Sequence, residues 1–134
     1  MNFFVFVYGT LLKGLQRERA LSRSQFIGQA WIQGLLYDLG SYPGLKEGGG
    51  KVFGELYSVD QATLNYLNRI EGYDSDAPEN SLYIRKKITV SLAATDETLE
   101  AESYFYNRPI LETKRITHGD YRAYLEEQAL QQKY

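Results

Sequence analysis

The chain has 134 residues, with 15 basic and 17 acidic side chains, one histidine and no cysteine. These counts exclude disulfides, cysteine nucleophiles, cysteine-ligated zinc and metal sites built from several histidines. The near balance of charge gives no reason to expect nucleic acid, whose binding proteins usually carry a basic excess. We therefore expect a single domain over residues 1–134, with chemistry that relies on carboxylates, hydroxyls, amines and backbone groups.

The N-terminal segment is apolar but too short for a signal peptide. Residues 3–7 form an unbroken apolar run that Tyr8 and Gly9 end, and no basic residue precedes it. No segment approaches the roughly 20 apolar residues that cross a bilayer. We therefore predict a soluble, cytoplasmic protein that does not enter a membrane and needs no obligate protein partner.

The first half of the chain alternates between apolar runs and glycine-containing turns, a pattern that favours strands. The predicted strands cover residues 3–7, 26–39 and 51–59. Gly28 and Gly34 are expected to be bulges in the second of them. A short helix is predicted over residues 16–22, a turn over 40–45, and a flexible hairpin connection at the glycine triplet 48–50.

The second half begins with a predicted helix. Asp60 is a typical N-cap residue, apolar residues recur at helical spacing up to Ile70, and Gly72 supplies the stop. Residues 82–94 and 99–106 are predicted to form a hairpin that turns near Asp96, and a last helix starts at residue 119 or 120. The sum is a mixed α+β domain, mostly strands, with two or three helices packed around them.

The turn after the first predicted strand is a candidate binding loop, with the sequence Tyr8, Gly9, Thr10, Leu11 and Leu12. A glycine directly after a buried strand lets the backbone turn sharply and approach a ligand closely. Successive amides in such a turn can bind an anion such as a carboxylate. Most pentapeptides of this kind are ordinary strand-ending turns, so this motif alone leaves both interpretations open.

Glu71 is a candidate general acid or base. It lies at the predicted C-terminus of the Asp60 helix, where the helix dipole already places partial negative charge. That field would raise the pKa of the carboxyl, which suits proton transfer near neutral pH. A solvated surface glutamate is the commoner interpretation of such a residue, but a locally unfavourable choice of residue is also typical of functional sites.

Other polar residues give weaker signals. His118 precedes the last helix and is expected to be a surface or capping residue, since no serine in a Gly-x-Ser-x-Gly setting accompanies it. Asp74, Asp76 and Glu79 lack the glycine and terminal glutamate of a calcium loop. We therefore expect a solvated acidic loop there and no metal site.

Twelve tyrosines are spread along the chain. Tyrosine combines bulk with a polar tip, so it suits both half-buried sheets and the walls of ligand pockets. Most of those in the predicted strands are expected to fill the core. Tyr42, Tyr83 and Tyr104 are also candidates for the wall of a cavity.

Several segments, taken in order, resemble the gamma-glutamylcyclotransferase-like (AIG2-like) family. The segments are residues 6–12, 42–45, 52–59, 64–73, 83–85 and 119–122. The most specific feature is the Tyr-Gly-Thr-Leu loop that starts at Tyr8, followed at this separation by Glu71 and Gly72. The chain is most similar to the short bacterial and gamma-glutamylamine-type members.

This resemblance implies a small mixed β-barrel with flanking helices and one cavity. It further implies that Tyr8, Gly9, Thr10, Leu11 and Leu12 bind a gamma-glutamyl group. Glu71 is implied as the acid/base. The implied reaction releases an amine or amino acid from a small-molecule gamma-glutamyl amide and forms 5-oxoproline, without a cofactor or a metal.

The chemistry of this reaction agrees with the composition of the chain. The substrate's own α-amine is the nucleophile, so no serine or cysteine is needed, and holding it near the carbonyl can contribute on the order of 7–11 kcal/mol. Two alternatives remain at this level. One is a non-catalytic or differently specific protein that binds a small metabolite in the same cavity, and the other is an interaction module with an exposed tyrosine-rich patch.

Overall fold

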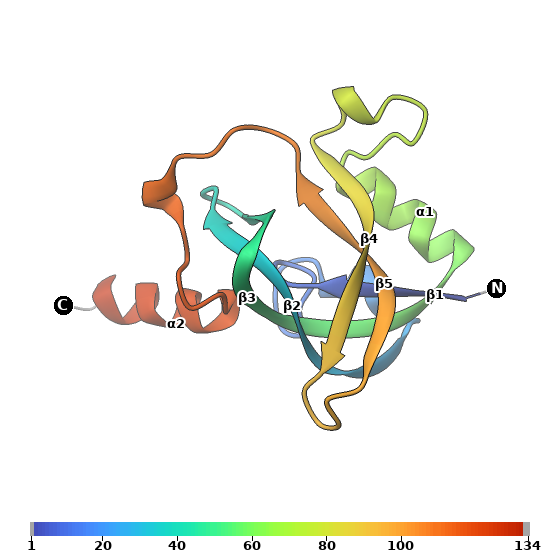
Figure 1. Ribbon diagram of the computed structural model, residues 1–134, viewed down its shortest axis with the longest axis horizontal. Helices are drawn as coiled ribbons and strands as arrows, with labels where there is room; N and C mark the ends of the chain where they lie inside the picture. Colours follow the sequence, from blue (N-terminus) through green and yellow to red (C-terminus); the bar gives the residue numbers. More distant parts are fainter. Residues whose placement is uncertain (1, 133–134) are drawn as a thin grey trace.

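Five strands close into a barrel in the computed structural model, which describes residues 2–132 (Figure 1). The strands are β1 Asn2–Val7, β2 Gln25–Asp38, β3 Pro43–Asp60, β4 Tyr83–Leu92 and β5 Thr98–Tyr106. The spatial order is β1-β3-β2-β4-β5. Every neighbouring pair is antiparallel except β1 and β5, which run parallel where Val5 pairs with Glu102. The predicted mixed β-barrel is therefore confirmed.

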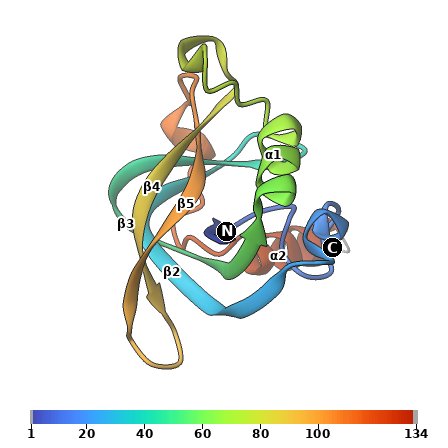
Figure 2. The same ribbon diagram turned by 90° about the vertical axis from the view of Figure 1, so that its right-hand side faces the viewer.

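The long β2–β3 hairpin corrects two of the predicted turns. Its connection is the short turn in which the Leu39 amide donates to the Tyr42 carbonyl at 3.0 Å, and β3 already begins at Pro43. The glycine triplet 48–50 therefore lies inside a strand and is not a hairpin connection. Figure 2 shows how both strands curve around the barrel.

Close packing explains two of the three glycines in this part of β3, Gly48 and Gly50. Gln33 pairs with Lys51 whereas Leu35 pairs with Lys46, so residues 47–50 bulge opposite Gly34. A Cβ atom on Gly48 would lie 2.4 Å from Cγ of Leu35. The predicted bulge at Gly34 is confirmed, as is a second register shift at Gly28.

Two α-helices flank the barrel, α1 Gln61–Ile70 and α2 Tyr121–Gln132, and lie towards opposite ends of the long axis in Figure 1. Asp60 caps α1 as predicted, because its Oδ1 accepts a hydrogen bond of 2.8 Å from the Thr63 amide. Gly72 ends the helix with a φ of +65°. Buried Leu64 and Leu67 attach α1 to the barrel.

The remaining helical turns are short. Residues 16–22 hold only the 3-10 helix Glu18–Leu21, which buries Leu21, and two further 3-10 turns cover Pro78–Asn80 and Glu112–Lys114. The predicted helix over 16–22 is thus corrected to a single tight turn, because its amides donate to carbonyls three residues back. No helix within residues 2–132 is long and apolar enough to span a membrane.

The core fills the inside of the barrel. Its fully buried side chains include Phe6 of β1, Ile32 and Leu36 of β2, and Leu56 of β3. Six of the twelve tyrosines are also buried, so half of them cannot contribute to an exposed tyrosine-rich interaction patch. They are Tyr8, Tyr37, Tyr57, Tyr83, Tyr104 and Tyr121.

Candidate active site

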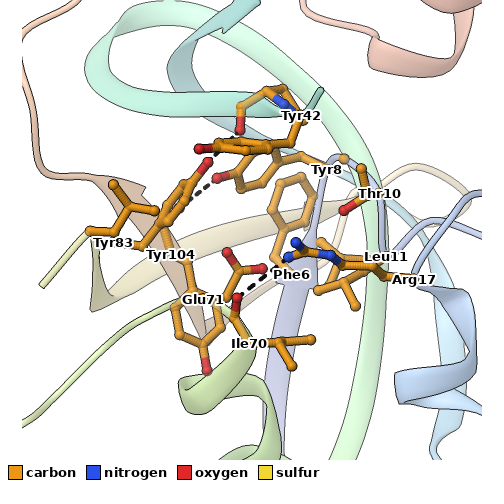
Figure 3. A pocket seen from close by; sticks show the side chains of 14 residues that line it. Phe6, Tyr8, Thr10, Leu11, Arg17, Tyr42, Ile70, Glu71, Tyr83 and Tyr104 are labelled. Atoms are coloured by element: carbon orange, nitrogen blue, oxygen red, sulfur yellow. Dashed lines mark hydrogen bonds between the residues drawn. The ribbon is translucent and has the colours of Figure 1, made fainter. Parts of the chain in front are cut away.

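A cavity of about 220 Å³ lies where five parts of the chain meet. Its wall comes from the end of β1 and the following loop, the start of β3, the C-terminal end of α1, the start of β4, and β5 (Figure 3). The lining residues are Phe6, Val7, Tyr8, Gly9, Thr10, Leu11, Arg17, Tyr42, Pro43, Ile70, Glu71, Leu82, Tyr83 and Tyr104. The volume is below the about 300–1,000 Å³ of drug-sized ligand sites, so the cavity suits a small metabolite.

The loop after β1 lines this cavity, and three of its backbone amides have no hydrogen-bond acceptor within residues 2–132. The Leu12 amide closes the turn on the Gly9 carbonyl at 2.9 Å. The amides of Gly9, Thr10 and Leu11, by contrast, donate to no acceptor within residues 2–132. Consecutive unpaired amides beside a cavity form a site for an anion.

Glycine at position 9 is required by packing. A Cβ atom there would lie 2.5 Å from Cγ of Pro43, which is inside any allowed contact distance. The loop therefore lies directly on the first residue of β3. The predicted loop residues Tyr8 to Leu11 all line the cavity, whereas the Leu12 side chain is buried in the core.

Glu71 lies across the cavity from this loop. Its amide still belongs to α1, donating to the Leu67 carbonyl at 3.0 Å, and Gly72 then turns the chain away. Figure 3 shows the carboxyl group pointing into the cavity, on the same side as the Arg17 guanidinium. Glu71 and the predicted binding loop thus face one shared space.

Burial changes the acidity of Glu71. Removal from water disfavours the charged carboxylate and raises its pKa from 4.5 to about 7, while the positive charge of Arg17 acts in the opposite direction. The position of Glu71 in the sequence predicts the direction of this pKa change, but through the helix dipole. Desolvation is the main cause in the structure.

Three buried tyrosines form a hydrogen-bonded part of the wall. Tyr8 donates to the Tyr104 carbonyl at 2.7 Å, and Tyr83 donates to the Pro43 carbonyl at 2.8 Å. The Tyr104 hydroxyl lies 2.6 Å from Oδ1 of Asn68 on α1. Burial raises the pKa of all three phenols, so they stay neutral and hold the wall in place. Tyr42 also lines the cavity, as do Tyr83 and Tyr104, the other two tyrosines that the sequence suggests for its wall.

Arg17 is the site residue that the sequence did not single out. Its amide donates to the Thr10 carbonyl at 2.7 Å, and its Nη1 lies 3.4 Å from the Ile70 carbonyl. The side chain therefore reaches from the binding loop to the end of α1. Nothing in the local sequence distinguishes it from the other basic residues, since only the closed barrel brings it beside Glu71.

The other candidate residues lie elsewhere. His118 is exposed and pairs with Glu127 of α2 at 2.6 Å. Asp74 and Glu79 are exposed in the loop after α1, and residues 2–132 contain no cluster of acidic, histidine or cysteine side chains suited to a metal.

The sequence profile of one protein family, described as "Gamma-glutamyl cyclotransferase, AIG2-like", matches residues 5–123. The chain belongs to this family. Among relatives, the gamma-glutamylcyclotransferase family protein YtfP of Escherichia coli K12 is 32% identical over 118 residues, which cover 87% of this chain and 94% of YtfP.

Two further relatives extend the comparison within the gamma-glutamylcyclotransferase family. A protein of Niallia circulans named gamma-L-glutamyl-butirosin B gamma-glutamyl cyclotransferase is 32% identical over 121 residues, covering 88% of this chain and 76% of that protein. The crystal structure of a mouse AIG2-like protein superposes with a TM-score of 0.74 at 24% identity, over 90% of this chain and 88% of the mouse chain. The mouse protein shares the barrel fold.

Proposed function

We propose that this member of the family is a gamma-glutamyl cyclotransferase that releases an amine or amino acid from a gamma-glutamyl amide and forms 5-oxoproline. The observation that carries the proposal is the arrangement of the cavity. A single carboxyl group, that of Glu71, faces a turn with three unpaired amides across a space of metabolite size. This arrangement suits a substrate that carries its own nucleophile.

The proposed binding step uses the loop after β1. The unpaired amides of Gly9, Thr10 and Leu11 hold a carboxylate or the oxyanion of the substrate. Phe6 and the tyrosine wall exclude water and leave little room for an extended chain. The glutamyl group is thereby bent so that its α-nitrogen lies near the γ-carbonyl carbon.

The proposed chemical step is a transfer of the acyl group within the substrate. The α-nitrogen attacks the γ-carbonyl carbon, a carbon–nitrogen bond of the five-membered ring forms, and the bond to the leaving nitrogen breaks. The α-ammonium nitrogen loses two protons on becoming the ring amide, and the departing amine gains two. Glu71 carries these protons one at a time, and a pKa of about 7 suits both directions of transfer.

The direct test is Glu71→Gln. Glutamine keeps the size of the side chain but cannot carry a proton, so formation of 5-oxoproline should fall by about 10²–10⁴-fold. The assay is chromatographic detection of 5-oxoproline from a panel of gamma-glutamyl amino acids and amines, with circular dichroism to show that the fold is kept.

The matched control is Glu79→Gln, which alters an exposed glutamate outside the cavity. It should leave the rate unchanged. Full activity of the Glu71→Gln variant would refute the role of Glu71. Binding of the panel by the wild-type protein without any 5-oxoproline would favour the non-catalytic alternative.

A further inference from the structure

The location of Arg17 points to a selective site for the leaving group, an inference that rests on the proposed function. We infer that the Arg17 guanidinium binds a carboxylate on the departing amine. Arg17 is then a specificity-determining residue, and gamma-glutamyl amino acids or peptides are preferred over gamma-glutamyl amines without a carboxylate.

Arg17 is held at both ends. Its amide donates to the Thr10 carbonyl at 2.7 Å, which ties its backbone to the binding loop. Its Nη1 lies 3.4 Å from the Ile70 carbonyl, one residue before Glu71. Figure 3 shows the guanidinium between these two parts of the site, facing the same space as the Glu71 carboxyl.

Arg17 forms no salt bridge in the described structure, although its charge acts on the nearby Glu71 carboxyl without direct contact. Among residues 2–132 the ion pairs involve Arg85, Lys86, His118 and Arg122, and Arg17 is in none of them. The weak contact with a backbone carbonyl leaves most of its N–H groups without a partner. A planar guanidinium with free N–H groups is well suited to bind a carboxylate through two parallel hydrogen bonds.

The position of Arg17 beside Glu71 indicates which carboxylate of the substrate it binds. The glutamyl part of the substrate already has the unpaired amides of Gly9, Thr10 and Leu11. Arg17 instead lies beside Glu71, which must protonate the leaving nitrogen. In an amino acid the carboxylate is only two bonds from that nitrogen, so a group that contacts Glu71 brings it within reach of Arg17. A leaving group with a second amine would meet like charge here.

The experiment uses a matched pair of substrates, gamma-glutamyl-alanine and gamma-glutamyl-ethylamide, which differ only in the carboxylate of the leaving group. We expect the wild-type kcat/KM for 5-oxoproline formation to favour the alanine compound by about 10–100-fold, the range of a charge-assisted contact. In Arg17→Gln this preference should fall close to one. Arg17→Lys should keep part of it, and Arg69→Gln, an exposed arginine on α1, should keep all of it.

Comparing two substrates in one variant cancels any effect of Arg17 on Glu71 or on folding. An equal loss for both compounds in Arg17→Gln would show that Arg17 does not distinguish the leaving groups and would overturn the inference. Calorimetric binding of the pair to Glu71→Gln separates this result from a failure of the proposed function. A tighter binding of the alanine compound that needs Arg17 supports the selectivity even without turnover, and equal binding overturns it.

Discussion

At the scale of one residue, two opposing effects determine the pKa of Glu71. Burial makes its ionised form unfavourable and raises its pKa to about 7. Arg17 partly offsets this effect, because a nearby positive charge favours the carboxylate. The pair therefore sets the pH at which the proposed base becomes available.

The pH dependence of the reaction follows from this balance. The carboxylate form must accept the first proton, so kcat/KM should rise with pH through an apparent pKa of about 7 and then level off. Arg17→Gln removes the favourable charge, and the midpoint should move to higher pH. Initial rates of 5-oxoproline formation between pH 5 and 9 measure both midpoints. A midpoint that stays fixed in the variant would contradict the coupling.

Stability should respond to the same carboxyl group. With a pKa raised from 4.5 in the unfolded chain to about 7 in the fold, the native state holds more protons than the unfolded state within this window. The free energy of unfolding therefore falls as the pH rises from 4.5 to 7. Glu71→Gln removes this loss, so it should stabilise the fold at pH 8 by about 2–3 kcal/mol and by little at pH 4. Urea denaturation at both pH values tests this, and equal effects would exclude it.

At the scale of elements, the end of the binding loop is attached to β3 and α2 by an ion pair with one buried partner, Glu55, and one partly exposed partner, Arg122. Oε1 of Glu55 accepts from the Lys13 amide at 3.0 Å, and its Oε2 lies 3.3 Å from Nη2 of Arg122. Nη1 of Arg122 in turn donates to the Lys13 carbonyl at 2.7 Å. Both polar groups of the Lys13 backbone are thus held by the same pair of side chains.

Arg122→Met should loosen this attachment and leave the buried Glu55 carboxylate without its cation. Arg122 itself is 40% exposed, so we expect a loss of about 1–3 kcal/mol, less than the about 3–5 kcal/mol of a fully buried pair. Adding Glu55→Gln should restore part of the loss, since glutamine keeps an acceptor for Lys13 without a buried charge. Thermal unfolding of both variants measures the difference. A double variant no more stable than Arg122→Met would argue against an ion pair here.

The elements were largely predictable because their signals are local. The cap at Asp60, the stop at Gly72 and the bulge at Gly34 each depend on a few neighbouring residues. The triplet 48–50 was misassigned for the same reason, since three glycines in a row locally favour a turn. In the structure Gly48 lies close to Leu35 and Gly50 close to the Gly34 carbonyl, whereas Gly49 has open space around it. Only the pairing of β3 with β2 creates the requirement at Gly48 and Gly50.

At the scale of the whole molecule, the site exists only when the barrel is closed. Its wall takes residues that are far apart in the chain, from Phe6 of β1 to Tyr104 of β5, and β1 must pair with β5 to bring them together. Glu71 and the loop at Tyr8 are candidates from the sequence because a family motif marks them, and both line the same cavity in the structure. No such motif distinguishes Arg17. Leu12 belongs to the motif, but its side chain packs in the hydrophobic core.

Because the cavity forms with the fold, the product should stabilise the entire molecule. A ligand present at 100 times its Kd adds about 2.7 kcal/mol to the free energy of unfolding. We expect 5-oxo-L-proline to raise the Tm in proportion to the logarithm of its concentration above Kd, both in the wild type and in Glu71→Gln. The D-enantiomer is the control, since it cannot place ring and carboxylate in the same positions. Equal effects of the two enantiomers would rule out stereospecific binding in this cavity.

The contact between Gly9 and Pro43 also bears on how molecules enter and leave. The loop touches the first residue of β3 with no space for even a methyl group, and Tyr83 is hydrogen-bonded to the carbonyl of that same proline. This side of the cavity cannot open without disturbing β3 and β4. We therefore expect substrate and products to pass over the partly exposed lining residues, Arg17 and Thr10 among them. The arginine would then be an early charged contact for an arriving substrate and a late one for a departing amine.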